Sequence, residues 1–151
     1  MPKASVTRLI ECKRNQLIDL VLDIEKYPEF VPFCLGSRVY ERNTRENLTL
    51  IIADLTIGKG PFKDTYKSDV QFNKKTNTIK VTNIGGPLRH LENNWKFIES
   101  DNCTEILFDI DFEIENKFLN VVMTKSFQYG LNKIADAFQK RAQDLYQSSK
   151  N

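Results

Sequence analysis

The carboxyl-terminal stretch 116–146 constrains the fold most strongly, because its apolar residues recur with the spacing of a long α-helix. At about 3.6 residues per turn these residues form one apolar stripe along the helix. The stripe consists of Leu119, Met123, Phe127, Leu131, Ile134, Phe138, Ala142 and Leu145. Asn116 is placed to cap the first turn with its side-chain oxygen. A helix of this length needs a broad apolar surface against which to bury its stripe, and the rest of the chain has to supply it.

The remaining sequence predicts an antiparallel β-sheet as that surface. In the stretch 105–115 large apolar residues alternate with charged ones, which is typical of a strand with one buried and one solvent-facing side. Similar strand patterns cover 4–12, 36–42, 47–57, 62–72, 78–84 and 88–99. Short turns separate most of these patterns, so successive strands are expected to pair as a meander. A sheet of about seven twisted strands curls, and the long helix is expected to lie across its concave face.

Two short helices are predicted between the first two strands. Apolar residues in 17–24 have helical spacing, and Pro28 is expected to end this helix and to open a second short one. The sequence thus predicts a single α+β domain over residues 1–151. An aromatic-lined space between the helix and the sheet would suit a small molecule, but periodicity leaves open whether this space is a cavity or a filled core.

Composition narrows the class of protein. Hydrophobic residues make up 40% of the chain and charged residues 28%, which suffices for one sizeable core without a metal or a disulfide. The formal net charge of +2 does not favour binding to nucleic acid, DNA included, or to an anionic membrane surface. The three cysteines are widely spaced and are expected to be reduced thiols in the cytoplasm. The sequence is also expected to carry no leader peptide and no membrane span.

Three motifs add a family resemblance. They are YPEFVPFC at 27–34, GPLRHLENNWKF at 86–97 and FDIDFEIENKFL at 108–119. In this order they resemble the START-like, helix-grip proteins of the polyketide cyclase/dehydrase superfamily, in the branch that contains coenzyme Q-binding proteins and ribosome association toxins. The resemblance implies a helix-grip fold, in which the curved sheet wraps around the long helix. It also implies a hydrophobic ligand cavity between the two.

The resemblance implies two alternative functions. The main prediction is a non-enzymatic carrier or chaperone that holds a ubiquinone-like isoprenoid lipid and supports respiratory electron transport. Such a carrier needs no cofactor, and it would contact the inner membrane peripherally and transiently. The alternative is a translation inhibitor that binds the large ribosomal subunit and blocks subunit association. An aromatase/cyclase-like enzyme would need an acid or base in the cavity, and the sequence offers only Asp64 and Arg89 for that role.

Large apolar residues are the candidates for lining the cavity. The predicted set is Tyr27, Phe30, Phe33, Phe62, Tyr66, Trp95, Phe108, Phe112, Met123, Phe127, Gly130, Leu131, Ile134 and Phe138. Their large side chains fit plain core packing as well. Gly130 costs about 1 kcal/mol relative to Ala inside a helix, so it suggests a close backbone approach or a kink. Segment 27–34 is dense in apolar residues, and it would form either a lip that touches lipid or a plug that closes one end of the sheet.

Few polar residues are candidates for a site. Asp64 and Arg89 fall in the inward phase of their strands and would place polar groups at the cavity rim, or form an ordinary ion pair. His90, the only histidine, is expected to point outward, so neither a general base nor a zinc site is predicted. Basic residues on the outer side of the long helix are interspersed with acidic ones and form a solvated surface or a ribosome-facing patch. They are Lys117, Lys125, Lys133, Lys140 and Arg141.

Overall fold

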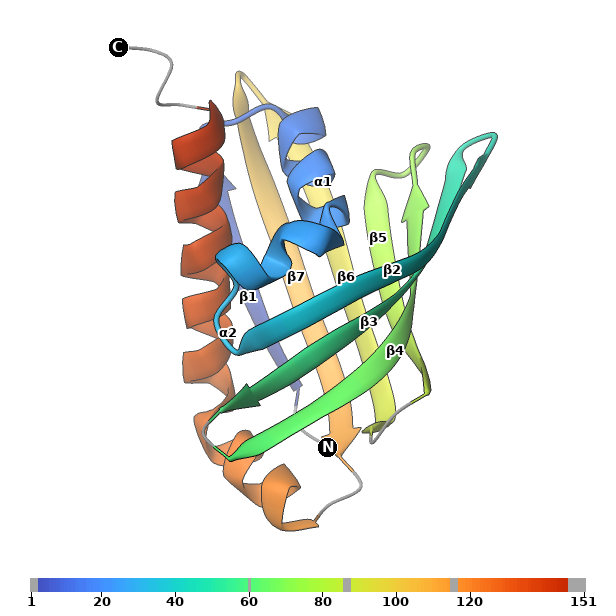
Figure 1. Ribbon diagram of the computed structural model, residues 1–151. Helices are drawn as coiled ribbons and strands as arrows, with labels where there is room; N and C mark the ends of the chain where they lie inside the picture. The colour runs from blue at the N-terminus through green and yellow to red at the C-terminus, as the bar shows by residue number, and fades with distance from the viewer. Residues whose placement is uncertain (1–2, 60, 86–87, 115–116, 147–151) are drawn as a thin grey trace.

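The computed structural model describes residues 3–59, 61–85, 88–114 and 117–146. Within these residues the elements are β1 (Lys3–Ile10), α1 (Arg14–Leu22), the 3-10 helix η1 (Ile24–Glu29), β2 (Cys34–Arg45), β3 (Leu48–Lys59), β4 (Phe62–Asn73), β5 (Thr78–Gly85), β6 (Leu88–Ser100), β7 (Cys103–Ile114) and α2 (Lys117–Tyr146). Figure 1 shows a strongly curved sheet, with α2 running along one side and with α1 and η1 over the same face. Asn116, the predicted helix cap, lies outside the described residues.

The strands form one antiparallel sheet in the order β1-β7-β6-β5-β4-β3-β2. Strands β2 to β7 therefore pair in succession, which confirms the predicted meander. The first strand does not pair with the second, because it lies at the far edge beside β7. The α+β class and the long carboxyl-terminal helix over a curved sheet are confirmed as well.

The two short helices are present, but the boundary between them differs from the predicted one. α1 ends at Leu22, and Pro28 lies inside η1 rather than at its start. Proline has no amide hydrogen to donate, and it disfavours the α-helical conformation at Tyr27. The chain therefore continues in tighter 3-10 turns, and the amide of Phe30 donates to the Tyr27 carbonyl at 3.1 Å.

One row of buried residues crosses the inner face of the sheet and forms the floor of the core. Val6 of β1 lies opposite Phe108 of β7, which in turn lies opposite Trp95 of β6. Ile79 of β5 continues the row beyond Trp95. Phe138 of α2 packs onto this row, with its ring centroid 5.3 Å from that of Trp95. The period-two alternation of the strands thus supplies the apolar surface that the helix stripe requires.

A buried hydrogen bond ties the connection after β1 to the sheet. Thr104 of β7 has 0% of its surface exposed, and its hydroxyl donates to the Cys12 carbonyl at 2.8 Å. Nearby, the backbone amide of Arg14 donates to the Glu99 carboxylate at 2.8 Å. Because a buried carbonyl needs a donor, the hydroxyl of Thr104 fixes the point where the chain leaves β1 and enters α1.

Replacing Thr104 with valine should test this bond, because the substitution keeps the shape of the side chain and removes the donor. Thr104→Val is expected to lower the free energy of unfolding by about 1–3 kcal/mol, since the Cys12 carbonyl would stay buried without a partner. Thr7→Val, on the solvent-facing side of β1, serves as the control and should change stability by no more than about 0.5 kcal/mol. Chemical denaturation of both variants is the measurement. Equal stability of Thr104→Val and the unsubstituted protein would contradict the assignment.

Candidate functional site

Aromatic side chains from the helices and the sheet meet above the floor of the core. Phe138 contacts Tyr27 and Phe30 at the end of η1, with ring centroids 5.4 and 5.1 Å apart and the rings nearly perpendicular. The Trp95 ring lies 5.3 Å from that of Phe138 and 4.3 Å from that of Phe108. Edge-to-face aromatic pairs add about 0.5–1.5 kcal/mol each beyond the burial of their surface. Five of the predicted cavity residues are thus brought together, and we call them the aromatic cluster.

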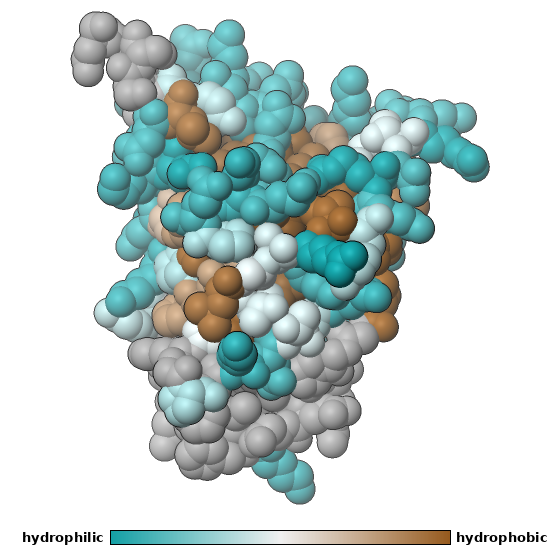
Figure 2. Space-filling view, in the orientation of Figure 1, coloured by the Kyte–Doolittle hydropathy of each residue, from teal (hydrophilic) through white to brown (hydrophobic). Residues whose placement is uncertain are grey.

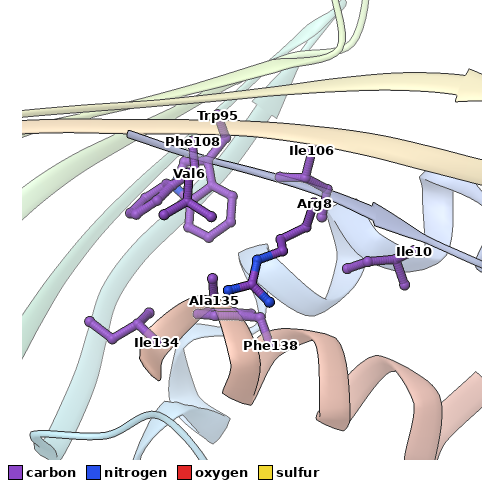
Figure 3. A pocket seen from close by; sticks show the side chains of 9 residues that line it. All are labelled: Val6, Arg8, Ile10, Trp95, Ile106, Phe108, Ile134, Ala135 and Phe138. Atoms are coloured by element: carbon purple, nitrogen blue, oxygen red, sulfur yellow. The ribbon is translucent and has the colours of Figure 1, made fainter. Parts of the chain in front are cut away.

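A small cavity lies beside the aromatic cluster, between β1 and α2 (Figure 3). Its volume is about 20 Å³, which is room for about one water molecule. The cavity is lined by Val6, Arg8, Ile10, Trp95, Ile106, Phe108, Ile134, Ala135 and Phe138. Pockets that hold small molecules usually measure about 300–1,000 Å³. The space between the sheet and the carboxyl-terminal half of α2 is therefore a filled core at this position.

The side chain of Arg8 connects β1 with α2. It extends from the inner face of β1 toward the helix (Figure 3), and Nη1 lies 2.6 Å from the Asp136 carboxylate and 3.3 Å from the Gln139 amide oxygen. Because the pair is partly exposed, its contribution to stability is on the order of 1 kcal/mol or less. Arg8 was not among the predicted residues, although its inward phase between Val6 and Ile10 is a signal that marks it.

Three polar groups of the interior, those of Tyr27, Tyr66 and Cys34, are neutral at physiological pH. Burial, together with the neighbouring Cys34, raises the pKa of both Tyr27 and Tyr66 well above the usual tyrosine value. Burial also raises the pKa of the Cys34 thiol, and a backbone hydrogen bond at Gly36 offsets part of this increase. The Tyr27 hydroxyl donates to the Val21 carbonyl. These groups can act as hydrogen-bond donors, but they are not poised as bases or nucleophiles.

Tyr66 of β4 and Phe112 of β7, both predicted cavity residues, lie in a second apolar group, distinct from the aromatic cluster. Phe112 and Leu91 are its buried members, and Tyr66 and Ile110 pack against them. This group lies toward the end of β7 from which the chain continues into α2. The structure therefore divides the predicted cavity residues between two places along the inner face of the sheet.

The predicted residues of α2 also differ in their surroundings. Leu131 is buried in the core, and Ile134 lies at the small cavity. A β-carbon at Gly130 would lie 3.7 Å from the ring of Phe33, which is an ordinary contact distance. The contact with Phe33, the one nearest to Gly130, would therefore leave room for a β-carbon and does not require glycine at this position.

Several predicted residues are not described at the level of their side chains. Those of Phe62, Arg89, Met123 and Phe127 lie outside the described part of the structure. Asp64 is exposed near the start of β4. The proposed rim pair of Asp64 with Arg89 therefore stays a prediction.

His90 points away from the core, as predicted. It lies opposite Glu113 on the outer face of the sheet, and its Nε2 atom is 3.7 Å from the Asp111 carboxylate. Among the residues that the structure describes, no group of three or more His, Cys, Asp or Glu side chains is placed to hold a metal ion. The same part of the chain contains no helix with the length and apolar character needed to cross a bilayer.

The basic residues on the outer side of α2 have local partners where their side chains are described. Lys140 lies 3.3 Å from Asp144, and Arg141 lies 3.0 Å from Glu29. The Lys133 ammonium lies 4.8 Å from the centroid of a neighbouring tyrosine ring. These contacts favour the interpretation of this helix face as a solvated surface.

Segment 27–34 packs into the core at Phe30, which favours the plug over the lip. Besides its contacts with Tyr27 and Phe138, the Phe30 ring lies 5.0 Å from the guanidinium carbon of Arg141. On the face of the molecule that carries α1, η1 and β2, the hydrophobic residues form small separate areas between hydrophilic ones (Figure 2). No broad apolar lip is visible on the described part of this face.

Substitution of Phe30 should distinguish a plug from a lip. Phe30→Ser is expected to lower the free energy of unfolding by about 3 kcal/mol or more, because the aromatic contacts are lost and a cavity remains. Leu35→Ser is the matched control, because it also replaces a large apolar residue with serine, but at an exposed position shortly after Phe30 in the sequence. It should change stability by no more than about 0.5 kcal/mol. Thermal or denaturant melts measure both. A Phe30→Ser protein as stable as the control would restore the lip interpretation.

Comparison with known proteins agrees with this architecture. Residues 10–139 match the family described as polyketide cyclase/dehydrase and lipid transport. A ribosome association toxin, RatA, of Rickettsia prowazekii is 31% identical over 142 residues, which cover 92% of this chain and 94% of the toxin. The mitochondrial coenzyme Q-binding protein COQ10 of Dictyostelium discoideum is also 31% identical, over 95% of this chain and 70% of that protein.

Solved structures show the same fold. An 18 kDa protein from Caulobacter crescentus, determined in solution, superposes with a TM-score of 0.80 at 26% identity, covering 97% of this chain and 99% of that one. A START superfamily protein from Mycobacterium smegmatis superposes with a TM-score of 0.78 at 18% identity, covering 95% and 98% of the two chains. From its sequence match and its START-like helix-grip architecture, the chain belongs to the polyketide cyclase/dehydrase and lipid transport family.

Proposed function

We propose that the protein associates with the large ribosomal subunit, that it does so through its surface, and that it performs no catalysis. The observation that carries this proposal is the similarity to the Rickettsia prowazekii ribosome association toxin, which extends over more than nine-tenths of both chains. The match to the coenzyme Q-binding protein covers only 70% of that protein. Of the two functions that the motifs imply, the comparisons favour ribosome association over the quinone carrier.

The filled core beside the carboxyl-terminal half of α2 supports a function at the surface. A cavity of about 20 Å³ beside the aromatic cluster cannot hold an isoprenoid tail, because a single water molecule already fills it. The aromatic contacts around Phe138 belong to a packed core, and their role in this proposal is to hold the domain rigid. A rigid domain binds a partner with a small loss of conformational entropy.

The chemistry of the interior supports a protein that is not an enzyme. The raised pKa values of Tyr27, Tyr66 and Cys34 keep these groups protonated. The single histidine faces outward. Among the described side chains, no acid or base is therefore poised for proton transfer inside the aromatic cluster.

Sucrose-gradient sedimentation tests ribosome association. The purified protein, added to separated ribosomal subunits, is expected to comigrate with the large subunit and not with the small one. At excess over subunits it should also reduce the fraction of joined ribosomes. A protein that remains at the top of the gradient with both subunits would reject the proposal.

A quinone carrier remains the second candidate, because one observation favours it. The coenzyme Q-binding relative has the same 31% identity as the toxin. The second apolar group around Phe112 and Leu91 lies apart from the filled aromatic cluster, and Tyr66 packs against it. The neutral Tyr66 hydroxyl could donate a hydrogen bond to a quinone carbonyl.

Organic extraction of protein purified from its native host separates the two candidates. Under the ribosome proposal, mass spectrometry should find no quinone at a ratio near one per protein. A ratio near one, in a protein that does not comigrate with ribosomal subunits, would favour the carrier instead. Tyr66→Phe then removes only the hydroxyl group, and a lower quinone content in this variant would locate the head group beside β4.

A further inference from the structure

On the outer face of the sheet, one arginine and one lysine side chain lie beside the same exposed tyrosine. The guanidinium carbon of Arg38 lies 4.8 Å from the centroid of the Tyr40 ring, and the ammonium of Lys67 lies 4.6 Å from the same centroid. Tyr40 is 45% exposed. Arg38 and Tyr40 belong to β2 and Lys67 to β4, and we call these three residues the cationic platform.

The strand pairing explains how the platform is assembled. Asp54 of β3 lies opposite Arg38 on one side and opposite Lys67 on the other, so the three strands bring the two cations onto one row. The pairing of β2 with β3 is irregular between Val39 and Glu41, and Tyr40 is the extra residue. A bulge of this kind re-aims a side chain. The Tyr40 hydroxyl donates to the Asp54 carboxylate, which holds the ring beside the two cations.

The two cations of the platform lack the acidic partners that other arginines have. Arg8, Arg42 and Arg141 each lie within 3.3 Å of a carboxylate. Within the described residues, neither Arg38 nor Lys67 has a carboxylate at salt-bridge distance. The Asp54 carboxylate lies on the row between them, so the two cations and this carboxylate together carry one net positive charge. Cation–π contacts hold both cations beside one ring, and the remaining positive charge attracts an anionic ligand.

The charges around the platform have an uneven distribution on the outer face. Lys63 is exposed further along β4, in the same outward phase as Lys67. Two strands beyond β5, the outer side of β7 carries Asp109, Asp111 and Glu113. Glu41, Asp54 and Asp69 also face outward on the β2–β4 side, so this side carries mixed charges, whereas the β7 side is acidic. A polyanion is therefore repelled from the β7 side and has its cationic contacts at the platform, although the whole chain has a net charge of only +2.

We propose that the cationic platform docks the protein onto an unpaired loop of ribosomal RNA. This inference rests on the proposed ribosome association and names the surface that performs it. Arg38 and Lys67 bind backbone phosphates, for which a guanidinium and an ammonium are suited. The exposed Tyr40 ring offers a surface on which an unstacked base can lie. The combination of an aromatic ring and flanking cations is the chemistry that single-stranded RNA favours over a protein partner.

The experiment compares two double variants that each remove two positive charges. Arg38→Gln/Lys67→Gln removes the cations of the platform. Lys133→Gln/Lys140→Gln removes two exposed cations from α2 and is the matched control. Binding of both to protein-free RNA from the large subunit, and to intact large subunits, is measured over a range of salt concentrations. Thermal melts confirm that both variants are folded.

The platform variant is expected to bind both probes at least about tenfold more weakly than the unsubstituted protein. Its plot of log affinity against log salt should be shallower by about 1.4, because two phosphate contacts to a single strand are lost. The α2 control should stay within about twofold of the unsubstituted protein, with the same slope. Tyr40→Leu should weaken binding by about fivefold or more because the stacking surface is lost, whereas Tyr40→Phe keeps the ring and should bind nearly normally.

Other results would overturn the inference in distinguishable ways. Equal losses in the two double variants would mean that only net charge matters, and a larger loss in the α2 control would move the docking surface to the helix. Failure of the unsubstituted protein to bind protein-free RNA would reject the platform as an RNA site. Binding to large subunits that is unaffected in the platform variant would reject the platform and leave the ribosome association standing. Platform-dependent binding to protein-free RNA without any binding to subunits would reject the ribosome association and leave the platform as an RNA-binding surface.

Discussion

The packing of Phe138 onto Trp95 is the contact on which the rest of the domain depends. Trp95 belongs to the apolar row that crosses four strands, and Phe138 lies in the stripe of the helix that covers this row. The rings of Tyr27 and Phe30 pack on Phe138 in turn. The sheet thus positions α2, and α2 positions η1. A shift of the helix would therefore move segment 27–34 as well, because dense packing transmits displacement between neighbouring elements.

The sequence predicts the layers of this fold well and the contents of the interior poorly. Alternation in 105–115 and in the neighbouring strands assigns Phe108, Trp95 and His90 to the correct faces, because period two leaves no other arrangement once one face is buried. The helix stripe is equally clear. Large apolar side chains look the same in a filled core and in a lipid cavity, so periodicity could not tell that the space beside Phe138 is nearly full. The position of Pro28 inside η1 depended on a 3-10 geometry that the residue pattern does not distinguish from an α-helix.

The cationic platform shows why surface sites are harder to predict than strands. Arg38 and Lys67 are far apart in sequence, and they meet only through the register of β2 and β4 with β3. The bulge that presents Tyr40 is invisible in the alternation of β2. The helix-grip fold itself is shared with proteins of unlike activity, including an aromatase/cyclase from Streptomyces that superposes with a TM-score of 0.77 at 11% identity. Features such as this platform therefore carry more information about function than the fold does.

The place of β1 at the edge beside β7 has a consequence for how the protein forms during its synthesis. β2 to β6 can pair as they emerge from the ribosome, because each partner follows its neighbour directly. β1 emerges first but has to wait for β7, its only partner in the sheet that the structure describes. Contacts between segments so distant in sequence slow folding. The nascent chain therefore carries an unpaired first strand through most of translation, and the domain can close only when the last strand and the long helix have been made.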